Sequence, residues 1–261
     1  MSLRRLLPPL LLLAGLALPA VAADTVDIFP AAALHLEGVR YQPVEPELQW
    51  QGWIGGGADL VRAHDVTLWT RAEVETILGH LIRPFEATQA NFHLSLGFRR
   101  TFRGLDFVPF FRHVSRHYVD RAKTEAVDWN MLGLEVSGRP WKPPVTVTAS
   151  LGHTTQASLP GYEWEARLLA EGLVWQRGRG SALLRGGLRR VTVSGEDDTL
   201  DRGDFTDWRL EGAARYATGD RALELFIAAE RRNDVFLEQP GARQRALFGF
   251  RVLMGRQDGT P

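Results

Sequence analysis

Apolar and polar residues alternate along most of the chain with a period of two. One stretch carries large apolar side chains at every second position: Phe92, Leu94, Leu96 and Phe98. The positions between them hold residues such as His93, Ser95 and Arg99. Because successive side chains of a β strand point to opposite sides, this pattern predicts strands with one apolar and one polar face.

Eleven segments follow this pattern and are predicted as strands of about ten residues each. They cover residues 48–61, 66–78, 90–101, 105–118, 128–136, 145–153, 162–173, 181–193, 204–216, 221–231 and 244–254. A weaker segment at 33–41 precedes them and is followed by Pro43 and Pro46. Bacterial barrels have an even number of strands, so we interpret this segment as the twelfth.

The connections between these segments alternate in length. Short ones lie at 62–65, 103–104, 138–144, 176–180 and 218–220, and longer ones at 79–88, 119–127, 154–160, 194–202 and 233–242. Short turns at one end and long loops at the other are typical of outer-membrane barrels, and closure removes unpaired sheet edges. We therefore predict an all-β fold, a closed antiparallel transmembrane β-barrel of about 12 strands. A soluble sandwich or lipocalin-like barrel with the apolar faces inside is the alternative.

The amino terminus has the features of a secretory signal peptide. Arg4 and Arg5 precede an apolar run at 6–18, and small residues at 20–22 form a cleavage site. We expect a signal peptide at 1–22, an N-terminal segment with the possible first strand at 23–46, the barrel at 47–254 and a C-terminal tail at 255–261. Export together with a barrel predicts the outer membrane of a Gram-negative bacterium.

Composition narrows the class further. The chain has no cysteine, which excludes disulfides, a cysteine-anchored lipoprotein and zinc–thiolate sites. Without Arg4 and Arg5, 29 basic residues face 31 acidic ones, so no basic field favours nucleic acid. Five of the eight tryptophans lie near strand ends, where an aromatic belt is expected: Trp50, Trp129, Trp164, Trp175 and Trp208.

The polar faces of the later strands carry charges of both signs. We expect these residues to share a narrow lumen: Glu163, Glu165, Arg167, Arg185, Arg189, Arg209, Glu211, Arg215, Glu224 and Glu230. Interleaved charges favour a hydrogen-bonded network that supports the wall, so we expect no wide pore. A selective channel is the alternative interpretation.

One strand pair carries candidate chemistry. His113 and Ser115 lie two residues apart on one face, with Cα atoms roughly 6.6 Å apart, so an imidazole can serve as general base for the hydroxyl. Asp128 and Asn130 lie on the matching face of the next strand, and either could orient His113. Polar residues at the end of a spanning strand can also stand above the lipid without any chemical role.

The segments His113-Val114-Ser115 and Trp129-Asn130 resemble outer-membrane phospholipase A, a twelve-stranded barrel with a His-x-Ser pair on one strand and a Trp-Asn step on the next. The resemblance implies Ser115 as nucleophile, His113 as base and Asn130 as orienting group, with Ca²⁺ near the oxyanion. The chain is also similar to lipid A 3-O-deacylase, which implies an orienting role for Asp128. Here Arg116 follows Ser115, where the phospholipase pattern has Asn-Gly.

Ligands for a metal are weakly indicated. Asp120 and Glu125 could contribute to a calcium site, and His117 with His113 and Asp120 could bind another metal, while the barrel itself requires no cofactor.

We expect outer-membrane lipids as partners, no nucleic acid, and a monomer or homodimer. Two functions follow. One is a non-catalytic barrel acting through its wall and loops, and the other is a serine acyl-ester hydrolase of phospholipid or lipid A.

Overall fold

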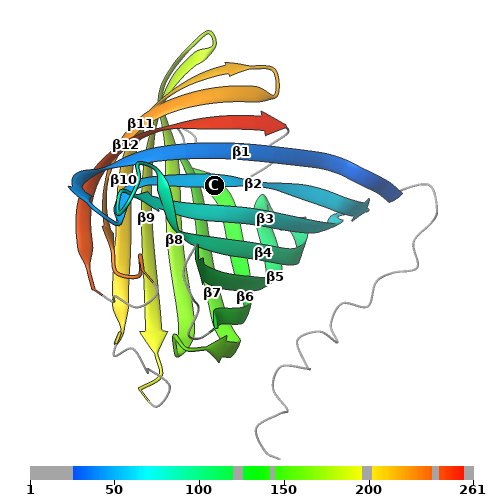
Figure 1. Ribbon diagram of the computed structural model, residues 1–261. Helices are drawn as coiled ribbons and strands as arrows, with labels where there is room; N and C mark the ends of the chain where they lie inside the picture. Colours follow the sequence, from blue (N-terminus) through cyan, green and yellow to red (C-terminus); the bar gives the residue numbers. More distant parts are fainter. Residues whose placement is uncertain (1–25, 120–125, 142–144, 196–201, 237–240, 256–261) are drawn as a thin grey trace, which may run out of the picture.

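The computed structural model describes residues 26–119, 126–141, 145–195, 202–236 and 241–255, and every regular element in these ranges is a β strand (Figure 1). The strands are β1 (Val26–Glu45), β2 (Leu48–Ala63), β3 (Val66–Gly79), β4 (Glu86–Phe102), β5 (Leu105–Tyr118), β6 (Val127–Trp141), β7 (Val145–Ser158), β8 (Tyr162–Arg177), β9 (Gly180–Val193), β10 (Phe205–Thr218), β11 (Arg221–Arg232) and β12 (Arg243–Gly255). No helix in these ranges is long and apolar enough to span a membrane.

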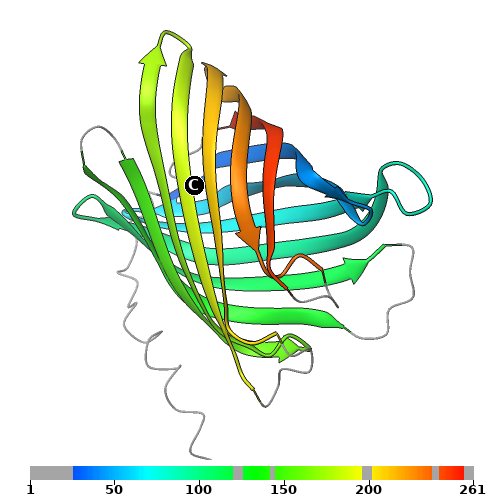
Figure 2. The same ribbon diagram turned by 90° about the vertical axis from the view of Figure 1, so that its left-hand side faces the viewer.

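The strands form one closed antiparallel barrel. Each strand pairs with its neighbours along the chain, and β12 closes the ring by pairing with β1 (Figure 2). This confirms the predicted fold class. Strand β1 includes the expected segment 33–41, and the barrel spans Val26 to Gly255 rather than 47–254. The expected signal peptide at 1–22 and residues 256–261 of the expected tail lie outside the described residues.

Connections of different length gather at opposite ends of the barrel. At one end, here called the turn end, two-residue turns join β2 to β3, β4 to β5, β8 to β9 and β10 to β11. The opposite end, called the loop end, carries the longer connections that follow β3, β5, β9 and β11. Two connections at the loop end are short and depart from the alternation: Pro46 and Glu47 join β1 to β2, and residues 159–161 join β7 to β8. The expected longer connection at 154–160 is therefore wrong.

The apolar faces of the strands point out of the barrel. On β11, Leu223, Leu225 and Ile227 are 47%, 60% and 71% exposed, whereas Glu224 between them is fully buried. A soluble barrel would bury the aliphatic residues and expose the glutamate, so this arrangement excludes the soluble alternative. An apolar outer belt around a charged interior is the arrangement of transmembrane barrels in bacterial outer membranes. The chain is therefore an outer-membrane β-barrel protein.

Strand β8 departs from the predicted alternation at its beginning. A register shift between Tyr162 and Trp164 turns Tyr162 inward, where it is 5% exposed, and leaves Glu163 and Trp164 both exposed. The expected lumenal position of Glu163 is therefore wrong. A β-bulge adds one residue to a strand, and the alternation on the two sides of it is then out of step.

One expected belt tryptophan lies inside the barrel. Trp129 is 3% exposed and contacts the ring of Tyr162 edge to face, with centroids 5.0 Å apart. It points inward because its neighbours on β6, Asp128 and Asn130, occupy the outward positions. Trp164, Trp175 and Trp208 remain exposed, as an aromatic belt requires.

Ion pairs cross the middle of the lumen and leave a cavity of about 420 Å³ there. The fully buried Glu224 carboxylate accepts hydrogen bonds from Arg185, Arg215 and Arg251, which come from three other strands at 2.6–2.8 Å. Arg185 also binds Glu211 at 2.7 Å. A buried carboxylate needs several donors to offset its lost hydration, and these arginines supply them. A cavity of about 920 Å³ remains at the turn end of the lumen.

The connection after β11 turns into the loop end of the lumen. Asp234 is 1% exposed and pairs with Arg116 of β5 and with Arg202, and it accepts a hydrogen bond from the Tyr162 hydroxyl. The amide of Gln89 donates to the backbone carbonyl of Val235 at 3.1 Å. These bonds fix an extended loop segment to the inside of three strands.

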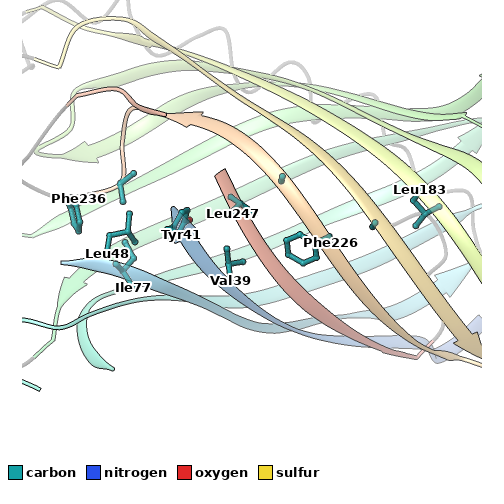
Figure 3. Packing of buried hydrophobic residues seen from close by; sticks show 11 residues of the cluster. Val39, Tyr41, Leu48, Ile77, Leu183, Phe226, Phe236 and Leu247 are labelled. Carbon is teal, nitrogen blue, oxygen red and sulfur yellow. The ribbon is translucent and has the colours of Figure 1, made fainter. Parts of the chain in front are cut away.

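Apolar side chains of the same loop segment also pack inside the lumen. Val235 and Phe236 are 1% and 5% exposed and belong to a buried cluster with Leu48, Ile77 and Tyr41 (Figure 3). The cluster continues along the lumen through residues such as Val39, Leu247 and Phe226. The loop end of the interior thus combines this apolar cluster with the buried ion pairs of Asp234, and the middle is ionic.

Candidate functional site on the outer wall

The His-x-Ser pair lies near the loop end of β5, on the face that points out of the barrel. Val114 and Arg116 are 2% and 5% exposed and face the lumen, so His113, Ser115 and His117 point outward by alternation. All three outward side chains are half-buried. The side chains that carry candidate chemistry therefore lie on the wall and not in the lumen.

The register of the β5–β6 hairpin places Asn130 beside His113. Directly opposite residues are His113 and Asn130, and Ser115 and Asp128. The Nδ1 atom of His113 lies 2.8 Å from the Oδ1 atom of Asn130. An amide oxygen can only accept, so Nδ1 carries the hydrogen, and Nε2 of the neutral ring keeps its lone pair. From the sequence spacing, either Asn130 or Asp128 could orient His113. The strand register places Asn130 opposite His113 and Asp128 opposite Ser115.

Ser115 forms its hydrogen bond with a different histidine. Its Oγ atom lies 3.2 Å from Nε2 of His117, which follows it by two residues on the same face. The His117 ring also meets Phe92 of β4 edge to face, with centroids 5.4 Å apart. His117 was expected only as a metal-ligand candidate, so the sequence did not indicate this contact with the serine. The period-two alternation that placed His113 and Ser115 together also places His117 with them.

A second amide supports Asn130 from the next strand. The Nδ2 atom of Asn130 donates to Oε1 of Gln156 on β7 at 3.2 Å. This donation directs the Nδ2 group away from β5 and leaves Oδ1 toward His113. No pattern in the sequence indicated a role for Gln156, because residues 154–160 lack alternating apolar residues and were expected to form a loop. In the structure β7 continues to Ser158.

The site borders the apolar belt on one side and polar wall on the other. Phe92 and Leu94 on β4 lie opposite Ser115 and His113, and they are 44% and 49% exposed. Toward the turn end, Leu132 on β6 is 45% exposed. On the far side, Gln156 and Ser158 continue the polar surface across β7. Ester groups of membrane lipids occupy such a boundary between acyl chains and headgroups.

This arrangement contains the elements of nucleophilic acyl transfer. It has a hydroxyl with an imidazole within hydrogen-bond distance, and a second imidazole whose tautomer is fixed by an amide. A serine becomes a useful nucleophile when an adjacent base removes its proton, and a third group orients the base. No ion pair involves His113, Ser115 or Asn130 among the described residues.

A calcium site is not formed by the described part of the wall. Asp128 is the carboxylate that faces Ser115, and no group of three or more His, Asp or Glu side chains in the described ranges could hold a metal ion. Calcium takes six to eight oxygen ligands, so Asp128 does not fit the ion without further groups. The expected ligands Asp120 and Glu125 lie outside the described residues. We derive no step through a metal.

Comparison with known proteins adds the fold but not a family. No protein-family model matches the chain, and no curated protein does. Among solved structures, LpxR from Salmonella typhimurium matches with a TM-score of 0.50 and 10% identity, over 85% of this chain and 99% of that one. This likeness shows a shared barrel fold.

Other bacterial outer-membrane barrels match less well. The translocator domain of the autotransporter NalP from Neisseria meningitidis gives a TM-score of 0.44 at 11% identity, covering 91% of this chain and 90% of that one. OmpT from Vibrio cholerae gives a TM-score of 0.43 at 8% identity, covering 89% and 99%. At these values neither match bears on the role of this chain.

Proposed function

We propose that this barrel is a serine acyl-ester hydrolase that acts on phospholipid or lipid A at the surface of the outer membrane. The observation that carries the proposal is the hydrogen bond between Nδ1 of His113 and Oδ1 of Asn130, on the outward face that also holds Ser115. A hydrogen bond from His113 to Asn130 on the next strand holds the imidazole in one orientation. Polar residues that only contact water at a barrel rim do not need such an orientation.

In the proposed reaction the Ser115 hydroxyl attacks the ester carbonyl of a lipid, and the lipid alcohol leaves. Water then hydrolyses the acyl-serine and releases the fatty acid. The acyl chain of the substrate would lie against Phe92 and Leu94, which are exposed beside the site. Its ester carbonyl would thereby reach the level of Ser115. His113 and Asn130 belong to the proton-transfer machinery.

The lumen is not part of this proposal. The ionic network around Glu224 and the apolar segment at Val235 and Phe236 occupy the interior, so we propose a barrel without a wide pore. Planar-bilayer recordings of the purified protein should show no large stable conductance. A conductance of the size of a general porin would contradict this part.

The test of the hydrolase compares wild type with Ser115→Ala. Both are purified in detergent and mixed with phospholipid or lipid A, and released fatty acid is measured. The variant should have only background activity while keeping heat-modifiable migration on gels. Ser181→Ala, on β9 at the turn end, is the matched control and should retain full activity. Equal hydrolysis by Ser115→Ala and wild type would refute the proposal.

One observation favours a second candidate function, a barrel without catalysis. Ser115 contacts His117 and not His113, so the three residues implied by the family resemblance do not form one continuous chain of hydrogen bonds. Under this candidate the polar residues only solvate the rim. A fluorophosphonate probe separates the two, because it labels a serine only where a neighbouring base activates it. Absence of labelling at Ser115 would favour the non-catalytic barrel.

A further inference from the structure

We infer that Ser115 works between two histidines with separate tasks. His117 removes the proton from Ser115, and His113 delivers a proton to the leaving alcohol. This division of roles rests on the proposed hydrolase function and assigns a further catalytic residue, His117. It differs from the family resemblance, which makes His113 the base for the serine.

The first support is the position of His117. Its Nε2 atom lies 3.2 Å from Oγ of Ser115, within the distance at which a base takes a proton from a hydroxyl. The edge-to-face contact with Phe92 holds the ring from the β4 side. His117 can therefore accept the proton of the Ser115 hydroxyl, and the Phe92 ring limits the rotation of its imidazole.

The second support is the different engagement of His113. Its Nδ1 is bound to Oδ1 of Asn130 at 2.8 Å, and Asn130 is itself held by Gln156. The ring nitrogen that remains for chemistry is Nε2. Because alternate residues share a face, His113 and His117 lie on the same outward surface as Ser115 and flank it along β5. A group there can reach the leaving oxygen while His117 holds the serine proton.

The acylation step balances with these roles. The Ser115 oxygen forms a bond to the carbonyl carbon, and its proton moves to Nε2 of neutral His117. The bond from that carbon to the alkoxy oxygen breaks, and the alkoxy oxygen takes the proton from Nε2 of protonated His113. The products are acyl-serine, a lipid alcohol, protonated His117 and neutral His113.

Deacylation exchanges the two tasks. Neutral His113 takes a proton from water, and the oxygen of that water bonds to the acyl carbon. The bond between this carbon and the Ser115 oxygen breaks, and protonated His117 returns its proton to the serine. The fatty acid is released, His113 is protonated and His117 is neutral, so both histidines regain their starting states. Microscopic reversibility requires such an exchange when one group acts as base and then as acid.

The surroundings of the two rings contain few other charges. From β6, Asp128 faces Ser115 and Asn130 faces His113. From β4, the facing residues are Ala90, Phe92 and Leu94, which do not titrate. On β5 itself, Arg112 and Arg116 have their side chains on the lumenal face. Asp128 is thus the charged group that faces this surface from the described parts of β4 and β6.

The test uses two esters that differ in their leaving group. A nitrophenyl ester expels a stable anion that needs no protonation, whereas a lipid ester expels an alkoxide that does. His113→Gln should therefore give a burst of about one nitrophenol per protein, within roughly tenfold of the wild-type rate, and then stall as acyl-enzyme. His117→Gln should slow this burst by a factor of about 10²–10⁴. Both variants should lose turnover of the lipid ester.

Each outcome of this test has a defined meaning. If His113→Gln loses the burst, or both variants lose it equally, His113 acts on the serine and the division of roles is wrong, while the hydrolase proposal stands. A normal burst in His117→Gln also overturns the division of roles. If Ser115→Ala still hydrolyses both esters, the hydrolase proposal fails together with it. Heat-modifiable migration reports that each variant is folded.

A variant outside the two histidines keeps the inference testable if either substitution prevents folding. Asn130→Ala removes the partner of His113 and leaves the contact between Ser115 and His117 in place. Labelling of Ser115 by a fluorophosphonate, whose fluoride needs no acid, should remain within about threefold of wild type. Lipid-ester turnover should fall about 100-fold, since His113 is no longer oriented. Parallel loss of labelling and turnover would overturn the inference.

Discussion

Near the loop end, the two faces of β5 and β6 differ in the contacts that their side chains make. Inside the barrel, Arg116 is paired with the buried Asp234, and Trp129 packs against Tyr162. Outside, His113 and Asn130 are joined by a hydrogen bond, without an ion pair among the described residues. The inner face is buried and the outer face is half-exposed.

This difference follows from what surrounds each face. Inside, polar groups are removed from bulk water, so each charge needs an opposite charge, and these pairs support the wall. Outside, His113 and Ser115 stand beside exposed Phe92 and Leu94, and each of the two forms a hydrogen bond with a neighbouring side chain instead of an ion pair. We therefore expect inner substitutions to change stability and substitutions at the outer site to change activity.

The largest expected effect is at the centre of the lumen. Glu224→Ala leaves Arg185, Arg215 and Arg251 without their shared carboxylate and should cost about 3–5 kcal/mol of unfolding free energy. Urea unfolding in lipid vesicles, followed by tryptophan fluorescence, measures it. Glu163→Ala is the matched control, because Glu163 is exposed, and it should change stability by less than about 0.5 kcal/mol. If the two variants were equally stable, the inner ion pairs would not support the wall as proposed.

A charge on the lipid-facing side tests the orientation of the wall directly. Leu225→Arg places a guanidinium among acyl chains and should destabilise the barrel by about 2–4 kcal/mol in vesicles. Met254→Arg, outward at the turn end of β12, should cost only about 0–1 kcal/mol because the membrane interface is near. A larger cost for Met254→Arg than for Leu225→Arg would contradict the assigned depth of the belt.

The outer site should show the opposite behaviour from the lumen. Asn130→Ala should reduce lipid-ester turnover about 100-fold, equivalent to about 2.7 kcal/mol in the barrier, through misplacement of His113. Its urea midpoint should stay close to that of wild type, since Asn130 is half-exposed. Gln156→Ala should have a smaller effect on turnover, because Gln156 only supports Asn130. A large loss of stability in Asn130→Ala would mean that Asn130 stabilises the fold, and would contradict its role in orienting His113.

The smallest effect is expected at the turn end. Asp65 accepts a hydrogen bond from Nε of Arg100 at 2.7 Å, and this bond lowers the pKa of the exposed Asp65 carboxyl. A carboxyl with a lowered pKa adds stability above its unfolded pKa and loses it as the pH falls through the folded value. Asp65→Asn should thus shift the urea midpoint slightly at pH 7, and the difference should shrink toward pH 3. An effect that grows at acid pH would contradict the assigned pairing.

Some features of this protein follow from local alternation alone. The pattern at residues 92–98 or 223–227 separates an apolar from a polar face, because strand geometry repeats every two residues. The placing of His113 and Ser115 on one face is of the same kind. The even strand count supported a twelfth strand at 33–41, although its own pattern was weak.

Other features depend on contacts between distant segments. The bulge at Tyr162 and Trp164 moved Glu163 out of the lumen, and alternation carries no sign of where an extra residue is inserted. The choice of Asn130 over Asp128 depends on hairpin register, and the partners of Glu224 depend on barrel closure. A period of two determines which face a residue occupies, but only the register between paired strands determines which residues meet there.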